Sequence, residues 1–223
     1  MQSRLIHGTQ PWARYEVVLD VSKESATVVF GVLLDGRGQI WISDVLMEIV
    51  DSSVVTTNWG PPRPQAVGLD FEADIFAWGL TGDSPYDYDY TINPEVAHTG
   101  NQSGYLYSRI ENPMNSGAVG QMIQAARYLG QRVRLSGYLK TEAIEKSAGF
   151  WLRVDDADGR VLNFDNMQDR PVVGTTDWQL YDIVLEVPST GAIIGLGAWL
   201  EGSGQLWVDD FQIEIVGEAT TIP

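Results

Sequence analysis

Alternating apolar and polar residues dominate residues 104–216 and predict a domain built of β-strands. Asp158-Gly159 and Gly202-Ser203-Gly204 lie between such runs and are typical of tight hairpins, because glycine tolerates a positive φ. Short strands separated by turns indicate an all-β protein, here an antiparallel β-sandwich of the jelly-roll type. The expected strands, rich in β-branched and aromatic residues, are Gly104–Ile110, Arg132–Lys140, Ala148–Val154, Trp178–Val187, Ala192–Leu200 and Gln205–Val216.

Residues 117–129 fit two patterns. Met122, Ile123, Ala126 and Tyr128 can be placed on one face of a short helix. The same stretch can also form a strand that ends in a turn at Gly130. We favour the strand, because the surrounding pattern is that of an antiparallel sandwich.

An internal repeat links the two ends of the chain, since residues 1–51 align without a gap on residues 167–217. Identical pairs hold the register along the whole length: Trp12/Trp178, Tyr15/Tyr181, Gly31/Gly197, Gly36/Gly202, Gly38/Gly204, Trp41/Trp207 and Asp44/Asp210. A period this long indicates duplication of a whole domain rather than a solenoid. The chain is therefore expected to contain a second-half copy of the domain followed by a complete copy.

The repeat also predicts the domain boundaries. Residues 1–51 are the half-copy, residues 52–68 are a proline-rich linker, residues 69–217 are the complete β-sandwich and residues 218–223 are a tail. Strand-like runs at about 14–21, 26–34 and 39–49 would expose apolar faces and unpaired backbone groups if the half-copy stood alone. The missing first half is expected either in an upstream segment absent from this chain or in a partner. We expect these strands to pair, in a homodimer formed through the half-copy.

Composition narrows the possible partners. The chain has 14 Lys and Arg against 30 Asp and Glu, which gives a net charge of −16 and argues against nucleic acid or an anionic membrane as a direct partner. The chain contains no cysteine, so no disulfide restricts the compartment, and the localisation is unknown. No apolar run is long enough to cross a bilayer, so no membrane span is expected.

Several motifs of the complete copy resemble a known family. They are Leu-Asp-Phe-Glu at 69–72 with Trp78, the Ser-Gly loop at 98–106, Val-Arg-Leu-Ser-Gly-Tyr-Leu-Lys at 133–140 and Trp-Val-Asp-Asp-Phe at 207–211. This ordered series resembles the galactose-binding-like jelly roll of non-catalytic carbohydrate-binding modules. Phe-Asp-Asn-Met-Gln-Asp-Arg-Pro at 164–171 and Gly-Asp-Ser-Pro-Tyr-Asp-Tyr at 82–88 also resemble accessory domains of some bacterial helix-turn-helix transcription regulators.

The strand at 193–201 suggests a ligand-binding face. If it alternates, Gly195, Gly197, Trp199 and Glu201 share one side, and two glycines beside a tryptophan would leave an open shelf on which a sugar ring can stack. The candidate ligand-binding residues are Trp199, Trp151, Arg153, Asp155 and Glu201, with Tyr86 and Tyr88 as the rim of the same cleft. Packing of the tryptophans under loops, and an edge strand at 86–90, are the alternatives.

The resemblance further implies a structural calcium ion near the paired terminal strands, with Glu72, Asp210 and Asn101 as candidate ligands. Turn carboxylates bonded to backbone N–H groups are the alternative. The sequence contains only two histidines and no motif of a known catalytic site, so we expect no enzymatic activity. The leading hypothesis is carbohydrate binding without catalysis; the alternative is a structural, strand-swapped or sensory accessory domain that binds no sugar.

Overall fold

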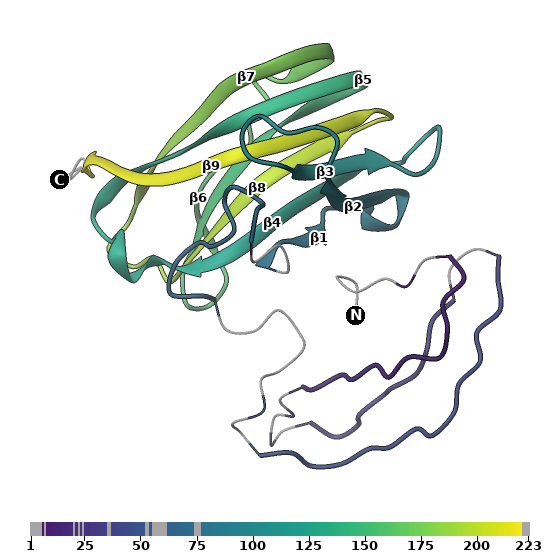
Figure 1. Ribbon diagram of the computed structural model, residues 1–223. Coiled ribbons are helices and arrows are strands. Elements are labelled where there is room, and N and C mark those ends of the chain that lie inside the picture. Colours follow the sequence, from purple (N-terminus) through teal and green to yellow (C-terminus); the bar gives the residue numbers. More distant parts are fainter. Residues whose placement is uncertain are drawn as a thin grey trace. The chain divides into compact units, whose positions relative to one another are not determined.

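The computed structural model describes residues 62–73 and 77–219 and, in the N-terminal part, residues 6, 8–19, 21, 23, 25–34, 37–51 and 54. The chain divides between Pro61 and Pro62 into two units, each described here by itself. The described residues of the first unit form neither helix nor strand, and their large apolar side chains are exposed, Val29 to 90% (Figure 1).

The second unit is an antiparallel β-sandwich with two short 3-10 helices, as the sequence predicted for its fold class. Among the described residues no helix could cross a bilayer. Labels follow Figure 1, and the elements are β1 Gly79–Thr81, η2 Pro85–Asp87, β2 Tyr88–Asn93, β3 Ser103–Ser108, β4 Ser116–Gln124, η3 Ala125–Arg127, β5 Gln131–Asp155, β6 Val161–Asp165, β7 Val172–Val187, β8 Ile193–Glu201 and β9 Gln205–Glu218.

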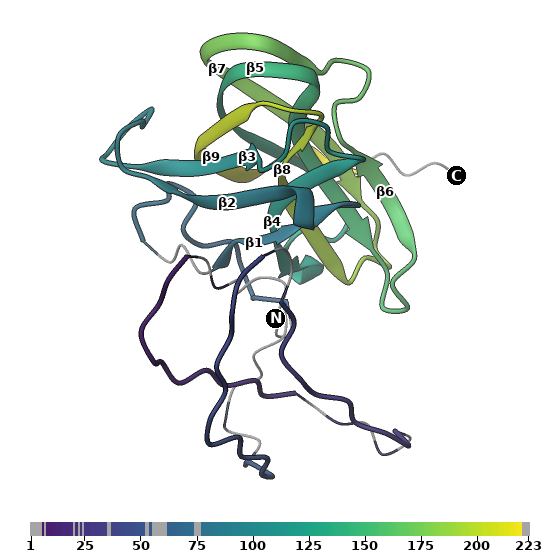
Figure 2. The ribbon, with the colours of Figure 1, turned by 90° about the vertical axis from the view of Figure 1, so that its right-hand side faces the viewer.

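Strand β5 holds the two layers together, because it changes its neighbours along its length. Residues 131–142 pair with β7 and β9, whereas residues 147–155 pair with β8 and β6. Register shifts between Leu139 and Ala148 mark the corner. The first layer is β1-β4-β8-β5-β6 and the second is β2-β3-β9-β5-β7, and the strands curve around one core (Figure 2).

The core lies between the layers and is built by alternation. Leu135 and Leu139 of β5, Leu196 of β8 and Val208 of β9 are fully buried in one cluster. Each such side chain contributes roughly 1.5–3 kcal/mol relative to an exposed one. Four aromatic side chains in mutual contact close one end of that cluster: Phe71, Trp78, Phe150 and Phe211.

Residues 116–124 form strand β4 and residues 125–127 a single 3-10 turn, so the strand interpretation of 117–129 is confirmed.

Residues 62–68, which the sequence assigned to the linker, lie along β4. The Val67 N–H donates to Gln121 Oε1 at 3.1 Å, and Gln121 Nε2 donates to the Val67 carbonyl at 3.0 Å. The compact unit thus begins at Pro62.

Candidate functional site

Strand β8 separates two kinds of side chain, as its alternation predicted. The core-facing residues Ile194, Leu196, Ala198 and Leu200 are fully buried, and Gly195, Gly197, Trp199 and Glu201 lie on the outer face of the first layer. Trp199 belongs to a small separate cluster on that face, with Ala118, Trp151 and Met122.

The open shelf expected on this face is not formed. Trp151 lies over the glycines, with ring atoms close to the positions that Cβ atoms would take at Gly120, Gly195 and Gly197. Its exposed fraction is 8% and that of Trp199 is 6%. The glycines therefore make room for an indole of the protein itself, and these two tryptophans offer no free ring face for a sugar.

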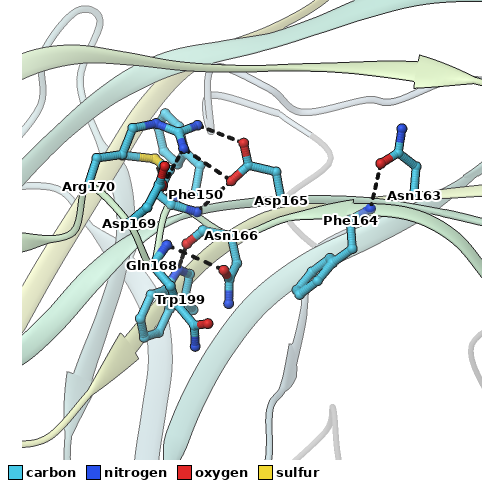
Figure 3. A network of polar contacts seen from close by, with 10 residues as sticks. Phe150, Asn163, Phe164, Asp165, Asn166, Gln168, Asp169, Arg170 and Trp199 are labelled. Atoms are coloured by element: carbon cyan, nitrogen blue, oxygen red, sulfur yellow. Dashed lines mark hydrogen bonds and ion pairs between the residues drawn. The ribbon is translucent and has the colours of Figure 1, made fainter.

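The β6–β7 connection covers part of this cluster (Figure 3). Trp199 Nε1 donates to the Asn166 carbonyl at 2.8 Å, and the Phe150 N–H lies 3.3 Å from Met167 Sδ. Arg170 holds the connection together, since its Nη2 donates to Asp165 Oδ2 at 2.8 Å and its Nη1 to Asp169 Oδ1 at 2.7 Å. The tryptophans thus pack under a loop, which was the alternative interpretation.

The Asp165–Arg170 pair makes the stability of this loop depend on pH. Burial raises the pKa of Asp165, but hydrogen bonds from Arg170 and from the Met167 N–H outweigh burial and hold the pKa below its usual value. The pair therefore stabilises the fold above the unfolded pKa near 3.9, and its contribution is lost as the pH falls through the lower folded pKa.

We expect Asp165→Asn to lower the free energy of unfolding by about 1 kcal/mol at pH 7, and by less than half of that at pH 3. Urea denaturation followed by circular dichroism between pH 3 and pH 7 would measure the difference. Asp169→Asn is the matched control, because Asp169 contacts the same guanidinium from an exposed position and should contribute about 0.3 kcal/mol. An Asp165→Asn effect that is equal at every pH would contradict this account.

The other predicted polar residues of this face are already paired. Arg153 Nε donates to Asp155 Oδ1 at 2.7 Å, and Asp155 is buried. Glu201 Oε1 accepts from Lys146 Nζ at 3.5 Å. The structure thus places Arg153, Asp155 and Glu201 on the outer face of the first layer with Trp151 and Trp199, but as closed contacts beside a buried cluster.

Tyr86 and Tyr88 do not act together as a rim. Tyr86 lies in η2 and is exposed, whereas Tyr88 is fully buried against Gly117. The Tyr88 hydroxyl donates a hydrogen bond to the Asn115 carbonyl at 2.6 Å, and burial raises the pKa of Tyr88 to about 12. Placing Tyr88 at a ligand rim was wrong; residues 88–93 form the edge strand β2 instead.

Glu72, Asn101 and Asp210 anchor a loop. Glu72 Oε1 accepts the Asn101 N–H at 2.7 Å, and this bond holds the pKa of Glu72 below its usual value. Asp210 accepts a hydrogen bond from the Thr99 hydroxyl at 2.8 Å and lies 2.6 Å from His98 Nδ1. Within the described part of the chain, no three His, Asp or Glu side chains gather as metal ligands. A cation would have to displace N–H and O–H donors, so calcium here stays a prediction.

The outer face of the second layer carries a different set of residues, the aromatic belt: Tyr105 and Tyr107 of β3, Trp207 of β9, Tyr138 of β5, Trp178 of β7 and His98 of the β2–β3 loop. Cross-strand pairing aligns Tyr105 with Trp207, and Trp207 with Lys140. Apart from Trp207, at 5% exposure, these side chains are partly exposed. The belt spans four neighbouring strands.

Ring stacking fixes the belt. The Tyr105 ring lies 5.0 Å from Trp207 and 4.7 Å from Tyr107, with the ring planes within about 22° of one another in each pair. The Tyr105 hydroxyl donates to Gln205, and the Tyr107 hydroxyl donates to Asp89 at 3.3 Å. Burial raises the pKa of both tyrosines above its usual value.

The buried Asp209 holds in place the part of the belt that contains His98, Tyr138 and Trp178. Asp209 Oδ2 accepts the N–H groups of His98 at 2.8 Å and Thr99 at 3.3 Å, which holds the β2–β3 loop over β5. His98 then stacks on Tyr138 with ring centroids 3.5 Å apart and meets the edge of Trp178 at 5.7 Å. Burial raises the pKa of Asp209, against the opposing effect of these N–H donors.

The internal repeat favours the belt over the first-layer face. On β9 several side chains outside the core are identical in both copies, although Asp209/Ser43 and Gln212/Leu46 differ; four core-facing pairs differ as well. The identical pairs are Gln205/Gln39, Trp207/Trp41, Asp210/Asp44 and Glu214/Glu48; the differing pairs are Leu206/Ile40, Val208/Ile42, Phe211/Val45 and Ile213/Met47. On β8, by contrast, the half-copy has Leu33 at the position that aligns with Trp199. Retained surface residues indicate a face that is used.

Solved structures share this architecture. The chain is 16% identical to the enzymatically active domain of tailspike protein 4 of bacteriophage CBA120, with a TM-score of 0.52, over 69% of this chain and 21% of that one. It is 17% identical to the CBM22-1–CBM22-2 tandem domain of Paenibacillus barcinonensis Xyn10C, with a TM-score of 0.50, over 76% of this chain and 49% of that one. The fold is a jelly-roll β-sandwich.

A third structure, the CBM22-1–GH10 modules of Clostridium thermocellum xylanase 10B with xylohexaose, has 17% identity and a TM-score of 0.50 over 65% of this chain and 27% of that one. These likenesses confirm the predicted resemblance to carbohydrate-binding modules at the level of the fold; they do not test the half-copy.

Sequence comparison gives one curated relative and no matching family model. The relative is described as the uncharacterized HTH-type transcriptional regulator YbfP of Bacillus subtilis (strain 168), 42% identical over 149 residues, which are 66% of this chain and 50% of the relative. The chain thus matches about half the length of that relative. Its description agrees with the second resemblance, to accessory domains of transcription regulators.

Sequence reasoning did not single out the belt, although two signals for it were present. Tyr105 and Tyr107 alternate within a predicted strand, so they had to share a face. Trp178 and Trp207 are both retained in the repeat, as Trp12 and Trp41. Only the cross-strand register places these four residues on one surface.

Proposed function

We propose that residues 62–219 form a non-catalytic carbohydrate-recognition domain whose ligand lies across the aromatic belt. The observation that carries this proposal is the belt itself: partly exposed aromatic side chains on adjacent strands, with polar groups beside them. Asp89 borders the belt beside Tyr107, and Lys140, paired with Asp177 at 2.8 Å, borders it beside Trp207.

This chemistry suits a polyhydroxylated ligand. Sugar C–H groups pack on aromatic rings, and sugar hydroxyls pair with neutral phenols, amides and carboxylates.

The fold supports the same class of ligand. One structure of similar fold consists of CBM22-1 and GH10 modules complexed with xylohexaose, and another is the CBM22-1–CBM22-2 tandem domain of Xyn10C. Sandwich folds host unrelated functions, so the fold alone does not locate a binding site. The choice of the belt as the binding face is supported instead by the surface residues of β9 that recur in the repeat.

The arrangement of acids supports binding without catalysis. A glycosidase needs one carboxylic acid with a raised pKa within reach of the substrate. Burial raises the pKa of Asp209, but Asp209 is fully buried with its oxygens bonded to backbone N–H groups. This acid cannot reach a ligand on the surface.

Calorimetric titration of the full chain with xylohexaose and with β-1,4-galactotriose tests the proposal. We expect at least one of them to bind, and Trp178→Ala to weaken that affinity about tenfold or more, because a partly exposed ring would be lost from the contact surface. Trp178 belongs to neither buried hydrophobic cluster, so the variant should fold.

Phe164→Ala is the matched control. Phe164 is an exposed aromatic residue on β6, outside the belt, and its loss should change the affinity less than twofold. An equal loss of affinity in both variants would move the ligand away from the belt. No binding of any neutral oligosaccharide at about 10 mM would remove the proposed function.

A sensory accessory role without sugar binding is the second candidate, favoured by the 42% identical relative described as a transcription regulator. The same titration separates the two. Binding of a sugar through Trp178 supports recognition, which a regulator could also use, whereas a folded domain that binds no sugar supports the second candidate.

A further inference from the structure

Two residues of the half-copy share an unusual backbone conformation with the residues they align with. Gly8 has a φ of 65°, and its counterpart Gly174 has 76°. Asp44 has a φ of 55°, and its counterpart Asp210, at the β9 bulge, has 50°. A positive φ is rare for a residue other than glycine. Two special positions of the segment from β7 to β9 thus recur in the described residues of the half-copy, whereas Gly38 does not share the positive φ of Gly204.

These strands need a partner that the half-copy does not contain. In the complete domain β7, β8 and β9 each pair with β5, and no ladder joins any two of them. Two half-copies brought together would still lack a strand equivalent to β5. The exposed apolar side chains of residues 25–34 and 37–51 are those that such a strand, with its layer, would cover.

Two glycines of β8 show what kind of partner fits. A Cβ at Gly197 would lie 1.9 Å from the Val119 carbonyl oxygen, which is backbone, and the half-copy keeps glycine there as Gly31. A Cβ at Gly195 would lie 2.7 Å from Cζ3 of Trp151, which is a side chain, and the half-copy has Val29 there. At Gly195 Met122 Sδ would also lie 2.8 Å away, but it is the end of a flexible side chain. Glycine is thus retained where backbone excludes a side chain and replaced where only side chains do, with the rigid indole of Trp151 as the main obstacle.

We infer that residues 8–51 form the second half of another sandwich, whose first half is homologous to residues 69–166 but has a small side chain at the position of Trp151. A second copy of this chain does not fit, because it would bring its own Trp151 against Val29, and its β5 is already paired with its own β7, β8 and β9. In this inference the partner of residues 8–51 is therefore a homologous first half, and not a second copy of this chain as in the homodimer expected from the sequence.

Grafting tests the inference in the full chain. Residues 174–217 are replaced by the sequence of residues 8–51, which has the same length, except that Asp209 is kept in place of Ser43 because it anchors the β2–β3 loop. The graft is made with Trp151 and with Trp151→Val. The wild-type chain and its own Trp151→Val variant complete the set. Thermal unfolding followed by near-ultraviolet circular dichroism reads out the sandwich.

We expect the substitution to act with opposite sign in the two backgrounds. In the wild-type chain Trp151→Val should lower the midpoint by about 10 °C, because it empties a filled site. In the graft the same substitution should raise the midpoint by several degrees (roughly 5 °C), because Val29 then has room.

Two results would overturn the inference. A graft without a cooperative transition in either background would mean that residues 8–51 do not encode these strands. A graft that folds but is destabilised by Trp151→Val, or is unaffected by it, would mean that the half-copy does not require a small residue there. Neither result bears on sugar binding, which the titration tests separately.

Discussion

Replacing Gly197 by alanine is expected to lower the free energy of unfolding by about 3 kcal/mol or more, enough to remove cooperative folding from a marginal domain. A Cβ at this position would lie 1.9 Å from the Val119 carbonyl oxygen and 2.7 Å from Gly120 Cα. Both atoms are backbone of the neighbouring strand β4, so relief requires β4 and β8 to separate along their shared ladder.

Gly217→Ala is the matched control. Gly217 lies in β9, and a Cβ there would meet only Arg132 Cδ at 4.0 Å. This variant should be neutral or slightly stabilising, by about 0.5 kcal/mol, because alanine restricts the unfolded chain. Urea denaturation of both variants measures the contrast. If Gly197→Ala unfolds within about 0.5 kcal/mol of the wild type, the packing of β4 against β8 is not as described.

Asp209→Asn should destabilise the domain by about 3 kcal/mol at pH 7 and weaken ligand binding as well. The Asp209 carboxylate is fully buried and accepts the N–H groups of His98, Thr99 and Asp210. An amide in its place turns one acceptor oxygen into an N–H₂ donor facing another donor. The β2–β3 loop then loses its anchor, and His98 loses its place on Tyr138.

Glu214→Gln controls for the loss of a negative charge on the same strand. Glu214 pairs with Arg134 at 2.6 Å, with both side chains nearly half exposed, so the change should cost about 0.5 kcal/mol. Equilibrium denaturation gives both values, and titration with whichever of xylohexaose and β-1,4-galactotriose binds gives the effect on the belt. An Asp209→Asn variant as stable as Glu214→Gln would show that the loop is held by other contacts.

Strand positions were largely readable from the sequence, because alternation reports a half-buried sheet directly. The run at 192–200 became β8 with the expected core-facing residues. Strand β5 was not readable as one element, because the polar stretch 141–147 separates two apolar runs. The chain continues through that stretch by register shifts, which turn the strand from one layer to the other.

The binding face was harder to predict, and the reason is geometric. Alternation shows that Trp199 shares a side with Gly195 and Gly197, but it cannot show that the indole of Trp151, on another strand, fills the space above them. Likewise the alternation of Tyr105 with Tyr107 does not reveal Trp207 beside them. Such neighbours depend on strand order and register across long stretches of chain.

The sequence by itself determined the all-β class, most strands, the hairpin glycines and the repeat, because these follow from local periodicity, turn chemistry and direct comparison within the chain. Only the tertiary structure decided that the outer face of the first layer is closed by its own tryptophans and that the second layer carries an aromatic belt. It also showed that β7, β8 and β9 all pair with the one strand β5. Burial and cross-strand contact are properties of the assembled sheets, and no local pattern encodes which side chain of a distant strand will cover a given face.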